Sequence, residues 1–113
     1  MWRPRLATSH AYGTVTAAEA ARLRDGGAQM VDVRATVEWR GGHVPGALHM
    51  PVHAMARRGS AELDADRPIV LVCATGHRST LAARTLVKRG FSQVFDLRGG
   101  MIAWRRAGLP VEA

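Results

Sequence analysis

The most informative hydrophobic pattern in the sequence is a short apolar run that ends at the only cysteine of the chain. Residues 69–72 are continuously apolar and mostly β-branched, a pattern typical of a strand buried on both faces of a parallel sheet. Pro68 precedes this run, and Gly76, which tolerates backbone angles closed to other residues, follows Cys73 closely. Residues 79–89 then have the pattern of a helix. The sequence therefore predicts a strand-to-helix turn that begins at Cys73.

Apolar runs and helical patterns alternate along the rest of the chain. Apolar runs predict further strands at residues 12–15, 29–33, 47–50 and 93–96. Apolar spacing and end signals predict helices at 17–25, 36–41, 52–58 and 100–107, with a polar linker at 59–67. The clearest end signal is Thr16 with Glu19 three residues later, a capping box. Alternating strands and helices predict an α/β fold with a mostly parallel sheet and helices on both faces.

Length and composition limit the organisation of the chain. Residues 1–11 lack periodicity, so we expect a flexible tail before a single domain at residues 12–113. The apolar stretches are shorter than the roughly 18 residues that cross a bilayer, and no secretory signal is recognisable. A single cysteine forms no internal disulfide, and a working thiol favours a reducing compartment. We therefore expect a cytoplasmic monomer without a membrane partner.

The formal net charge of +7 calls for an anionic partner. The arginines are scattered, with adjacent pairs only at 57–58 and 105–106, and no aromatic platform is interleaved with them. This distribution argues against nucleic-acid binding. A positive field that concentrates small anionic substrates is a sufficient interpretation. An acidic protein or carrier is the alternative partner.

The position of Cys73 favours chemistry over packing. The thiolate is the nucleophilic form of cysteine, and a helix N-terminus, the successive N–H groups of a turn and nearby cations all favour that anion. His77 and Arg78 can contribute to such a field. A buried cysteine that only ends a strand is the alternative. The glycine, arginine and serine that follow Cys73 favour an anion-binding loop.

Three ordered segments resemble the rhodanese-like sulfurtransferase family. Cys73 opens the segment CATGHRS at 73–79, which is similar to the active-site loop of that family. VDVR at 31–34, with EW at 38–39 and GHVPGA at 42–47, is similar to its amino-terminal signature, and LRGGMIAW at 97–104 to its carboxyl-terminal one. The resemblance implies a five-stranded rhodanese-like sheet with the cysteine loop after the fourth strand.

The resemblance also implies an activity. The Cys73 thiolate would take a sulfane sulfur from a donor such as thiosulfate and pass it from a persulfide to a thiol, cyanide or a protein cysteine. The active-site loop comprises Ala74, Thr75, Gly76, His77, Arg78 and Ser79. Its backbone N–H groups would stabilise the persulfide anion, and Arg78 with His77 would steer the donor. Ala74 is a departure, because some thiosulfate-using relatives carry a basic residue there.

Two other functions remain as alternatives at this point. Phosphatases and arsenate reductases of related fold carry Cys-x5-Arg, whereas four residues separate Cys73 from Arg78, and Ser79 stands in the arginine position. A shorter loop suits a sulfur atom better than a phosphate, by comparison with the family. A non-catalytic sulfur carrier or binding module of the same fold is the second alternative.

The remaining predictions concern supporting residues, metals and cofactors. We expect Asp32 and Arg34 to form a structural pair that also satisfies loop N–H groups and Glu38. We expect His43 to be a satisfied loop residue, and Trp39 and Trp104 to be packing residues. The histidines at 43, 49 and 53 match no usual zinc spacing with Cys73, and no phosphate-loop or dinucleotide motif is present. We therefore expect no metal and no cofactor.

Overall fold

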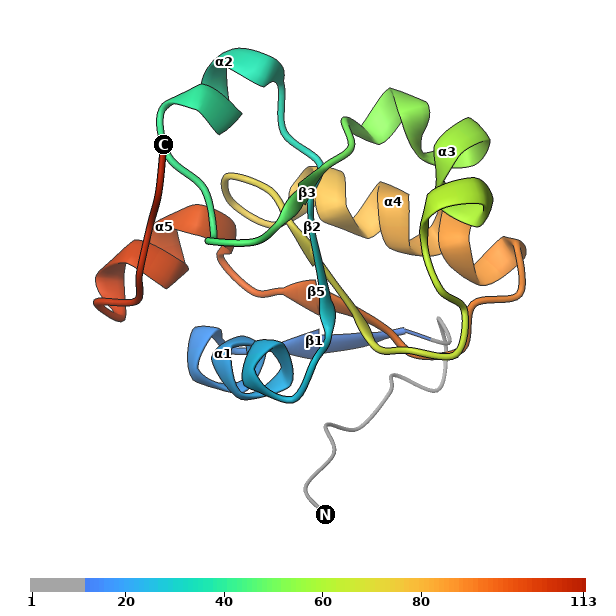
Figure 1. Ribbon diagram of the computed structural model, residues 1–113, viewed down its shortest axis with the longest axis horizontal. Coiled ribbons are helices and arrows are strands. Elements are labelled where there is room, and N and C mark those ends of the chain that lie inside the picture. Colours follow the sequence, from blue (N-terminus) through green and yellow to red (C-terminus); the bar gives the residue numbers. More distant parts are fainter. Residues whose placement is uncertain (1–11) are drawn as a thin grey trace.

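The computed structural model describes residues 12–113, in which five parallel strands form one sheet (Figure 1). The strands are β1 (Gly13–Val15), β2 (Gln29–Asp32), β3 (Leu48–His49), β4 (Ile69–Val72) and β5 (Val94–Leu97), in the spatial order β1-β5-β4-β2-β3. Every strand pair in this sheet is parallel. The predicted α/β fold is confirmed, and β4 occupies the centre of the sheet. The expected tail at 1–11 lies outside the described residues.

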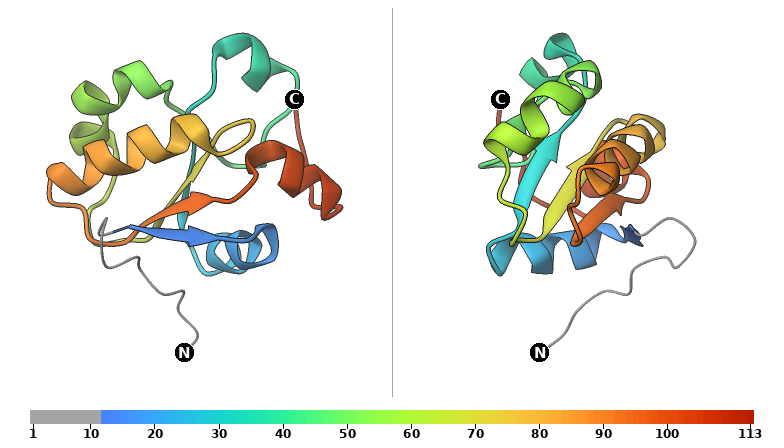
Figure 2. Two further views of the ribbon diagram at one scale, coloured as in Figure 1. Left: turned by 180° about the vertical axis from the view of Figure 1, so that it is seen from behind. Right: turned by 90° about the vertical axis from the view of Figure 1, so that its right-hand side faces the viewer.

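Helices cover both faces of the sheet, as predicted (Figures 1 and 2). The helical elements are α1 (Ala17–Asp25), α2 (Thr36–Arg40), the 3-10 turn η1 (Val52–Ala54), α3 (Met55–Glu62), α4 (His77–Lys88) and α5 (Gly100–Arg106). Buried residues of η1, α3 and α4 pack with one set of strand residues, and buried residues of α1 and α5 pack with another. Alternate residues of β2, β4 and β5 therefore enter separate cores.

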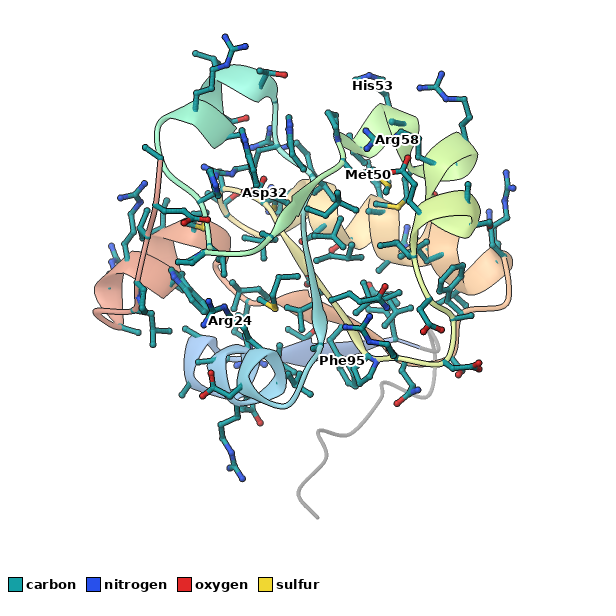
Figure 3. All side chains as sticks on the ribbon, viewed as in Figure 1. Arg24, Asp32, Met50, His53, Arg58 and Phe95 are labelled. Carbon is teal, nitrogen blue, oxygen red and sulfur yellow. The ribbon has the colours of Figure 1, made fainter. Side chains whose placement is uncertain are left out.

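The two cores divide the buried side chains by sheet face. Met50 belongs to the core under α3 and α4, whereas Phe95 belongs to the core under α1 and α5 (Figure 3). All four residues of β4 are buried, because this strand is covered on both faces and lies between β2 and β5. Cys73 follows directly and shares the core of Met50. Within residues 12–113, no helix has the length and apolarity that a membrane span requires.

Most predicted boundaries agree with the structure within one residue, and two differ by more, each for a physical reason. The expected polar linker at 59–67 is wrong in its first part, because α3 continues to Glu62. Gly59 is buried inside α3, where a Cβ atom would lie 2.8 Å from Leu86 Cδ2. Close packing of α3 on α4 thus outweighs the poor helix propensity of glycine. Helix α4 begins at His77, two residues earlier than predicted, since Gly76 already turns the chain into it.

The capping box at the start of α1 is confirmed. The Glu19 amide donates to the Thr16 hydroxyl at 3.2 Å, and the Thr16 amide donates to the Glu19 carboxylate at 2.8 Å. This reciprocal pair satisfies two N–H groups that the first helical turn otherwise leaves open. The helix ends at Asp25, as the two glycines that follow it predicted.

Candidate active site

Cys73 lies at the carboxyl end of the central strand, where open α/β sheets bind ligands. The Val33 amide donates to the Val72 carbonyl at 2.9 Å, so the segment that follows β2 runs beside the cysteine. Cys73 as a residue is only 1% exposed. The sulfur is therefore held in a defined environment rather than on an open surface.

The loop after Cys73 turns its own groups back toward the sulfur. Gly76 has φ +112°, in the left-handed region, and its amide donates to Cys73 Sγ at 2.8 Å. Ser79 Oγ lies 3.5 Å from the same sulfur atom, inside the first turn of α4. A backbone N–H donor and the positive end of a twelve-residue helix favour an anionic sulfur at this position.

Helix α5 anchors the loop from the other side. The amides of Met101 and Ile102 donate to the carbonyls of Cys73 and Ala74 at 2.8 and 3.3 Å. Gly100 has φ +53°, and a Cβ atom on it would lie 2.2 Å from the Cys73 carbonyl oxygen. The second glycine of LRGGMIAW is therefore required by a close approach between α5 and the active-site loop.

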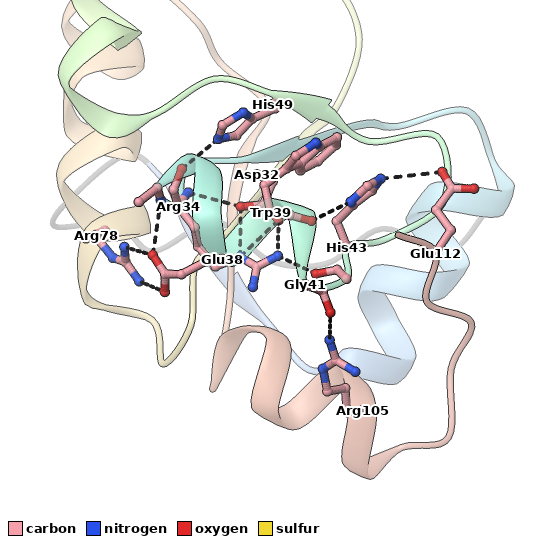
Figure 4. A network of polar contacts seen from close by, with 12 residues as sticks. Asp32, Arg34, Glu38, Trp39, Gly41, His43, His49, Arg78, Arg105 and Glu112 are labelled. Atoms are coloured by element: carbon pink, nitrogen blue, oxygen red, sulfur yellow. Dashed lines mark hydrogen bonds and ion pairs between the residues drawn. The ribbon is translucent and has the colours of Figure 1, made fainter.

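The structure pairs Arg78 with Glu38 of α2 (Figure 4). Two guanidinium nitrogens donate to the two carboxylate oxygens at 2.6 and 2.8 Å. The hydrogen bonds from Arg78 lower the pKa of Glu38 to about 2, and the carboxylate raises the pKa of Arg78. Much of the Arg78 charge is thus engaged by Glu38, although Arg78 was expected to serve an incoming donor. We expected the Asp32–Arg34 pair to satisfy Glu38. The hydrogen bonds from Arg78 have the larger effect on the pKa of Glu38, and the charge of Arg34 lowers it to a smaller extent.

Asp32 and Arg34 form the expected structural pair on the neighbouring strand end. The Arg34 guanidinium donates to both Asp32 oxygens, with the closest contact at 2.7 Å, and its backbone amide donates to Asp32 at 3.0 Å. The same guanidinium donates to the Gly42 carbonyl at 2.7 Å (Figure 4). Both residues are buried. They fix the β2–α2 connection that carries Glu38 toward Arg78.

His43 is satisfied by local contacts. Its Nδ1 lies 2.9 Å from the Trp39 carbonyl oxygen, its Nε2 lies 3.7 Å from Glu112, and its ring stacks on the Trp39 ring with centroids 3.4 Å apart. These contacts support the architectural role expected for His43. Trp104 is 1% exposed and donates from Nε1 to the Pro110 carbonyl at 2.7 Å, as a packing residue does.

Asp96 is a residue of the site that the sequence did not single out. It lies on β5 beside β4 and is 7% exposed, and the Ser79 hydroxyl donates a hydrogen bond to its Oδ1. Burial raises the pKa of Asp96, and the Ser79 hydrogen bond opposes that effect. The signal that could have found it is a carboxylate between Phe95 and Leu97, at the end of the strand predicted at 93–96.

The remaining loop residues are more open. Ala74 is partly buried, and Thr75 and His77 are exposed. Arg78 also borders a pocket of about 320 Å³ whose other walls come from the segments after β2 and β3: Val33, Ala35, Thr36, Pro51, Val52 and His53. Across residues 12–113, no group of three or more His, Cys, Asp or Glu side chains is arranged to hold a metal ion.

Comparisons with known proteins agree with this geometry. The family model described as "Rhodanese-like domain" matches residues 16–107. The chain belongs to the rhodanese-like family. A sulfurtransferase of Allochromatium vinosum is 43% identical over 84 residues, which cover 74% of this chain and 78% of that protein. The thiosulfate sulfurtransferase GlpE of Pseudomonas aeruginosa is 37% identical over 97 residues, which cover 86% and 87%.

Solved structures of this family show the same fold. A rhodanese-related protein from Thermoplasma volcanium superposes with a TM-score of 0.81 at 26% identity, over 89% of this chain and 98% of that one. The family predicted from the three segments is thereby confirmed, and the rhodanese-like match includes the Cys73 loop and the two glycines at the start of α5. The predicted activity class, sulfurtransferase, agrees with the names of the relatives.

Proposed function

We propose that this rhodanese-like protein is a sulfurtransferase in which Cys73 carries a sulfane sulfur as a persulfide. The observation that carries the proposal is the Gly76 amide, 2.8 Å from Cys73 Sγ in a turn at the start of α4. An N–H group held toward Cys73 Sγ stabilises the negative charge of the thiolate, both before it attacks the donor and when it leaves the persulfide. The name thiosulfate sulfurtransferase, borne by relatives, gives the donor class.

The reaction consists of two displacements. The Cys73 thiolate attacks the outer sulfur of thiosulfate, a new S–S bond forms, and sulfite leaves with the electron pair of the broken bond. A cyanide ion or a thiolate then attacks the outer sulfur of the persulfide and restores the Cys73 thiolate. Each displacement conserves charge and needs no redox partner. Covalent catalysis of this kind gives ping-pong kinetics.

The single cysteine determines how the persulfide is discharged. A second cysteine nearby would resolve a persulfide as a disulfide, and this chain has none. An external acceptor is therefore required, either a small thiol or the cysteine of a partner protein. The pocket beside Arg78 offers room for such an acceptor next to the loop.

Binding of the donor relies mainly on the backbone. Arg78 is held by Glu38 and Ala74 is uncharged, so neither offers thiosulfate a free cation. We therefore expect a high KM for thiosulfate together with an intact transfer step. Persulfides that carry less charge than thiosulfate are expected to be the better donors.

The phosphatase alternative is less well supported by the loop. Arg78 follows Cys73 after four residues instead of five and points its guanidinium nitrogens at Glu38. A phosphate ester would need that guanidinium free for its oxygens. Hydrolysis of an aryl phosphate as fast as sulfur transfer would contradict this assignment.

The test is direct detection of the carried sulfur. Purified protein is incubated with thiosulfate, the donor is removed, and the intact mass is measured. The expected product is heavier by one sulfur atom on the peptide that contains Cys73, and it returns to the starting mass when cyanide is added, with release of thiocyanate. Cys73→Ser, which keeps the volume of the side chain, is expected to lose both signals. The proposal is wrong if neither thiosulfate nor glutathione persulfide produces the adduct.

A further inference from the structure

The most unusual arrangement outside the loop backbone is a buried chain of three side chains from β4, α4 and β5. Cys73 Sγ lies 3.5 Å from Ser79 Oγ, and the Ser79 hydroxyl donates to Asp96 Oδ1. The three residues are 1%, 0% and 7% exposed. The two ionisable groups are therefore separated by one hydroxyl and shielded from water.

The hydroxyl group of Ser79 cannot serve all of its neighbours at once. It carries one proton, while the Cys73 sulfur, the Gly76 carbonyl at 3.1 Å and the Asp96 carboxylate all lie within hydrogen-bonding distance. An ionised Asp96 is the strongest acceptor of the three and takes that proton. The Ser79 oxygen then presents only lone pairs to the sulfur, an arrangement that suits a thiol and opposes a thiolate.

A neutral Asp96 reverses the arrangement. The carboxyl group donates to Ser79 Oγ, and the Ser79 hydroxyl is free to donate to an anionic sulfur. The Gly76 carbonyl keeps a second donor in either case, because the Thr80 hydroxyl donates to it at 3.1 Å. The orientation of a single hydroxyl group thus links the charge of Asp96 to the charge of Cys73.

We propose that Asp96 is a positioning residue that receives the proton of Cys73 through Ser79 and so turns the Ser79 hydroxyl toward the anionic sulfur. This inference rests on the proposed sulfur transfer and adds a residue to it. The thiol proton moves to Ser79 Oγ while the Ser79 proton moves to Asp96 Oδ1. No bond between heavy atoms changes, and the pair keeps one negative charge, which passes from the carboxylate to the sulfur.

The hydrogen-bonded series of Cys73, Ser79 and Asp96 acts in both displacement steps of the proposed reaction. Cys73 Sγ is anionic as the thiolate before attack and again as the leaving thiolate, whereas in the persulfide the negative charge lies on the outer sulfur atom. In both thiolate states Asp96 is neutral and the Ser79 hydroxyl donates to the Cys73 Sγ anion. Burial, which raises the pKa of Asp96, acts in the direction that this role requires.

The elements packed against Asp96 carry other ionisable groups that the test must allow for. They are Tyr12 before β1, His77, Arg78, Arg84 and Lys88 on α4, and Arg98 after β5. Strands β1 and β4 contribute none within Gly13–Val15 and Ile69–Val72. Comparing variants of Asp96 and Ser79 in one background keeps all of these groups constant.

The experiment measures the rate of Cys73 alkylation by neutral iodoacetamide as a function of pH, without a sulfur donor. Asp96→Asn replaces the carboxylate with an amide that donates to Ser79, as the neutral carboxyl does. We expect its alkylation midpoint to fall by about one to two pH units, the effect of removing a charge this close to the sulfur. Asp25→Asn removes an exposed carboxylate on α1 and is expected to retain the profile of the unmodified protein.

A double-mutant cycle separates the proton chain from a simple charge effect. In a Ser79→Ala background the connecting hydroxyl is gone, so Asp96→Asn is expected to shift the midpoint by less than half as much. An equal shift in both backgrounds would overturn the proposal, as would an Asp96→Asn profile that coincides with that of the unmodified protein. These readouts need no turnover, so persulfide formation and the role of Asp96 succeed or fail separately.

Discussion

Replacing Gly100 with alanine tests how closely helix α5 must approach the active-site loop. The new Cβ would lie 2.2 Å from the Cys73 carbonyl oxygen and 2.6 Å from the Ala74 carbonyl carbon, both of them backbone atoms. Rotation of a side chain cannot relieve these contacts, so either the loop or the start of α5 must move. The residue also has φ +53°, which an L side chain adopts only with strain.

The expected cost follows from these two causes. The positive φ angle contributes about 1 kcal/mol once the lower entropy of the unfolded alanine chain is taken into account. Overpacking contributes about 1–3 kcal/mol. Weakening the bonds from the Met101 and Ile102 amides to the loop carbonyls contributes about 1 kcal/mol more. The free energy of unfolding is therefore expected to fall by about 4 kcal/mol, which lowers Tm by roughly 15 °C for a domain of this size.

Gly108→Ala is the matched control. Gly108 has φ +72°, and a Cβ on it would meet no atom within 4 Å, so only the backbone strain remains. Its expected cost is about 1 kcal/mol. Urea unfolding at 25 °C gives both free energies, and thiocyanate formation gives the activity of each variant in its folded form. We expect at least a tenfold loss of activity in Gly100→Ala alone. Equal stability and equal activity in the two variants would refute the close-approach argument.

Three further predictions concern single side chains. Arg78 lowers the pKa of Glu38 to about 2, so the stabilisation by this carboxylate is present above about pH 4.5 and is lost as the pH falls toward 2. The pair is partly exposed, so the effect is expected to be about 1 kcal/mol. In chemical unfolding, the unmodified protein should lose about 1 kcal/mol more of its free energy of unfolding over that pH range than Glu38→Gln does. The pKa of Asp96 is raised, so the stabilising contribution of this residue is lost as the pH rises. The free energy of unfolding of Asp96→Asn, compared with that of the unmodified protein, should therefore be higher at pH 8 than at pH 4. A difference between the two proteins that does not change with pH would contradict this. Trp104→Phe leaves the Pro110 carbonyl without its indole donor and should cost about 2 kcal/mol in urea unfolding, while a cost below about 0.5 kcal/mol would show that the bond is dispensable.

Much of the fold could be predicted because its signals are local. The strand at 69–72 is a run of four apolar residues, and the start of α1 depends on Thr16 and Glu19, only three positions apart. The extension of α3 through Gly59 could not be predicted in this way. A glycine in a polar segment indicates a loop, and only the contact of α3 with Leu86 shows why a residue without a side chain is needed inside this helix.

The same difference between local signals and tertiary contacts applies to the candidate site. The sequence alone predicts that Cys73 follows a buried strand and opens a glycine-containing turn into a helix, because these features all lie within residues 69–79. The pairing of Arg78 with Glu38, forty positions away, and of Ser79 with Asp96, seventeen positions away, is visible only in the folded chain. Those partners depend on which strands are neighbours and where each connection crosses the sheet edge. The apolar periodicity of a strand records that it is buried, but not which strand lies beside it.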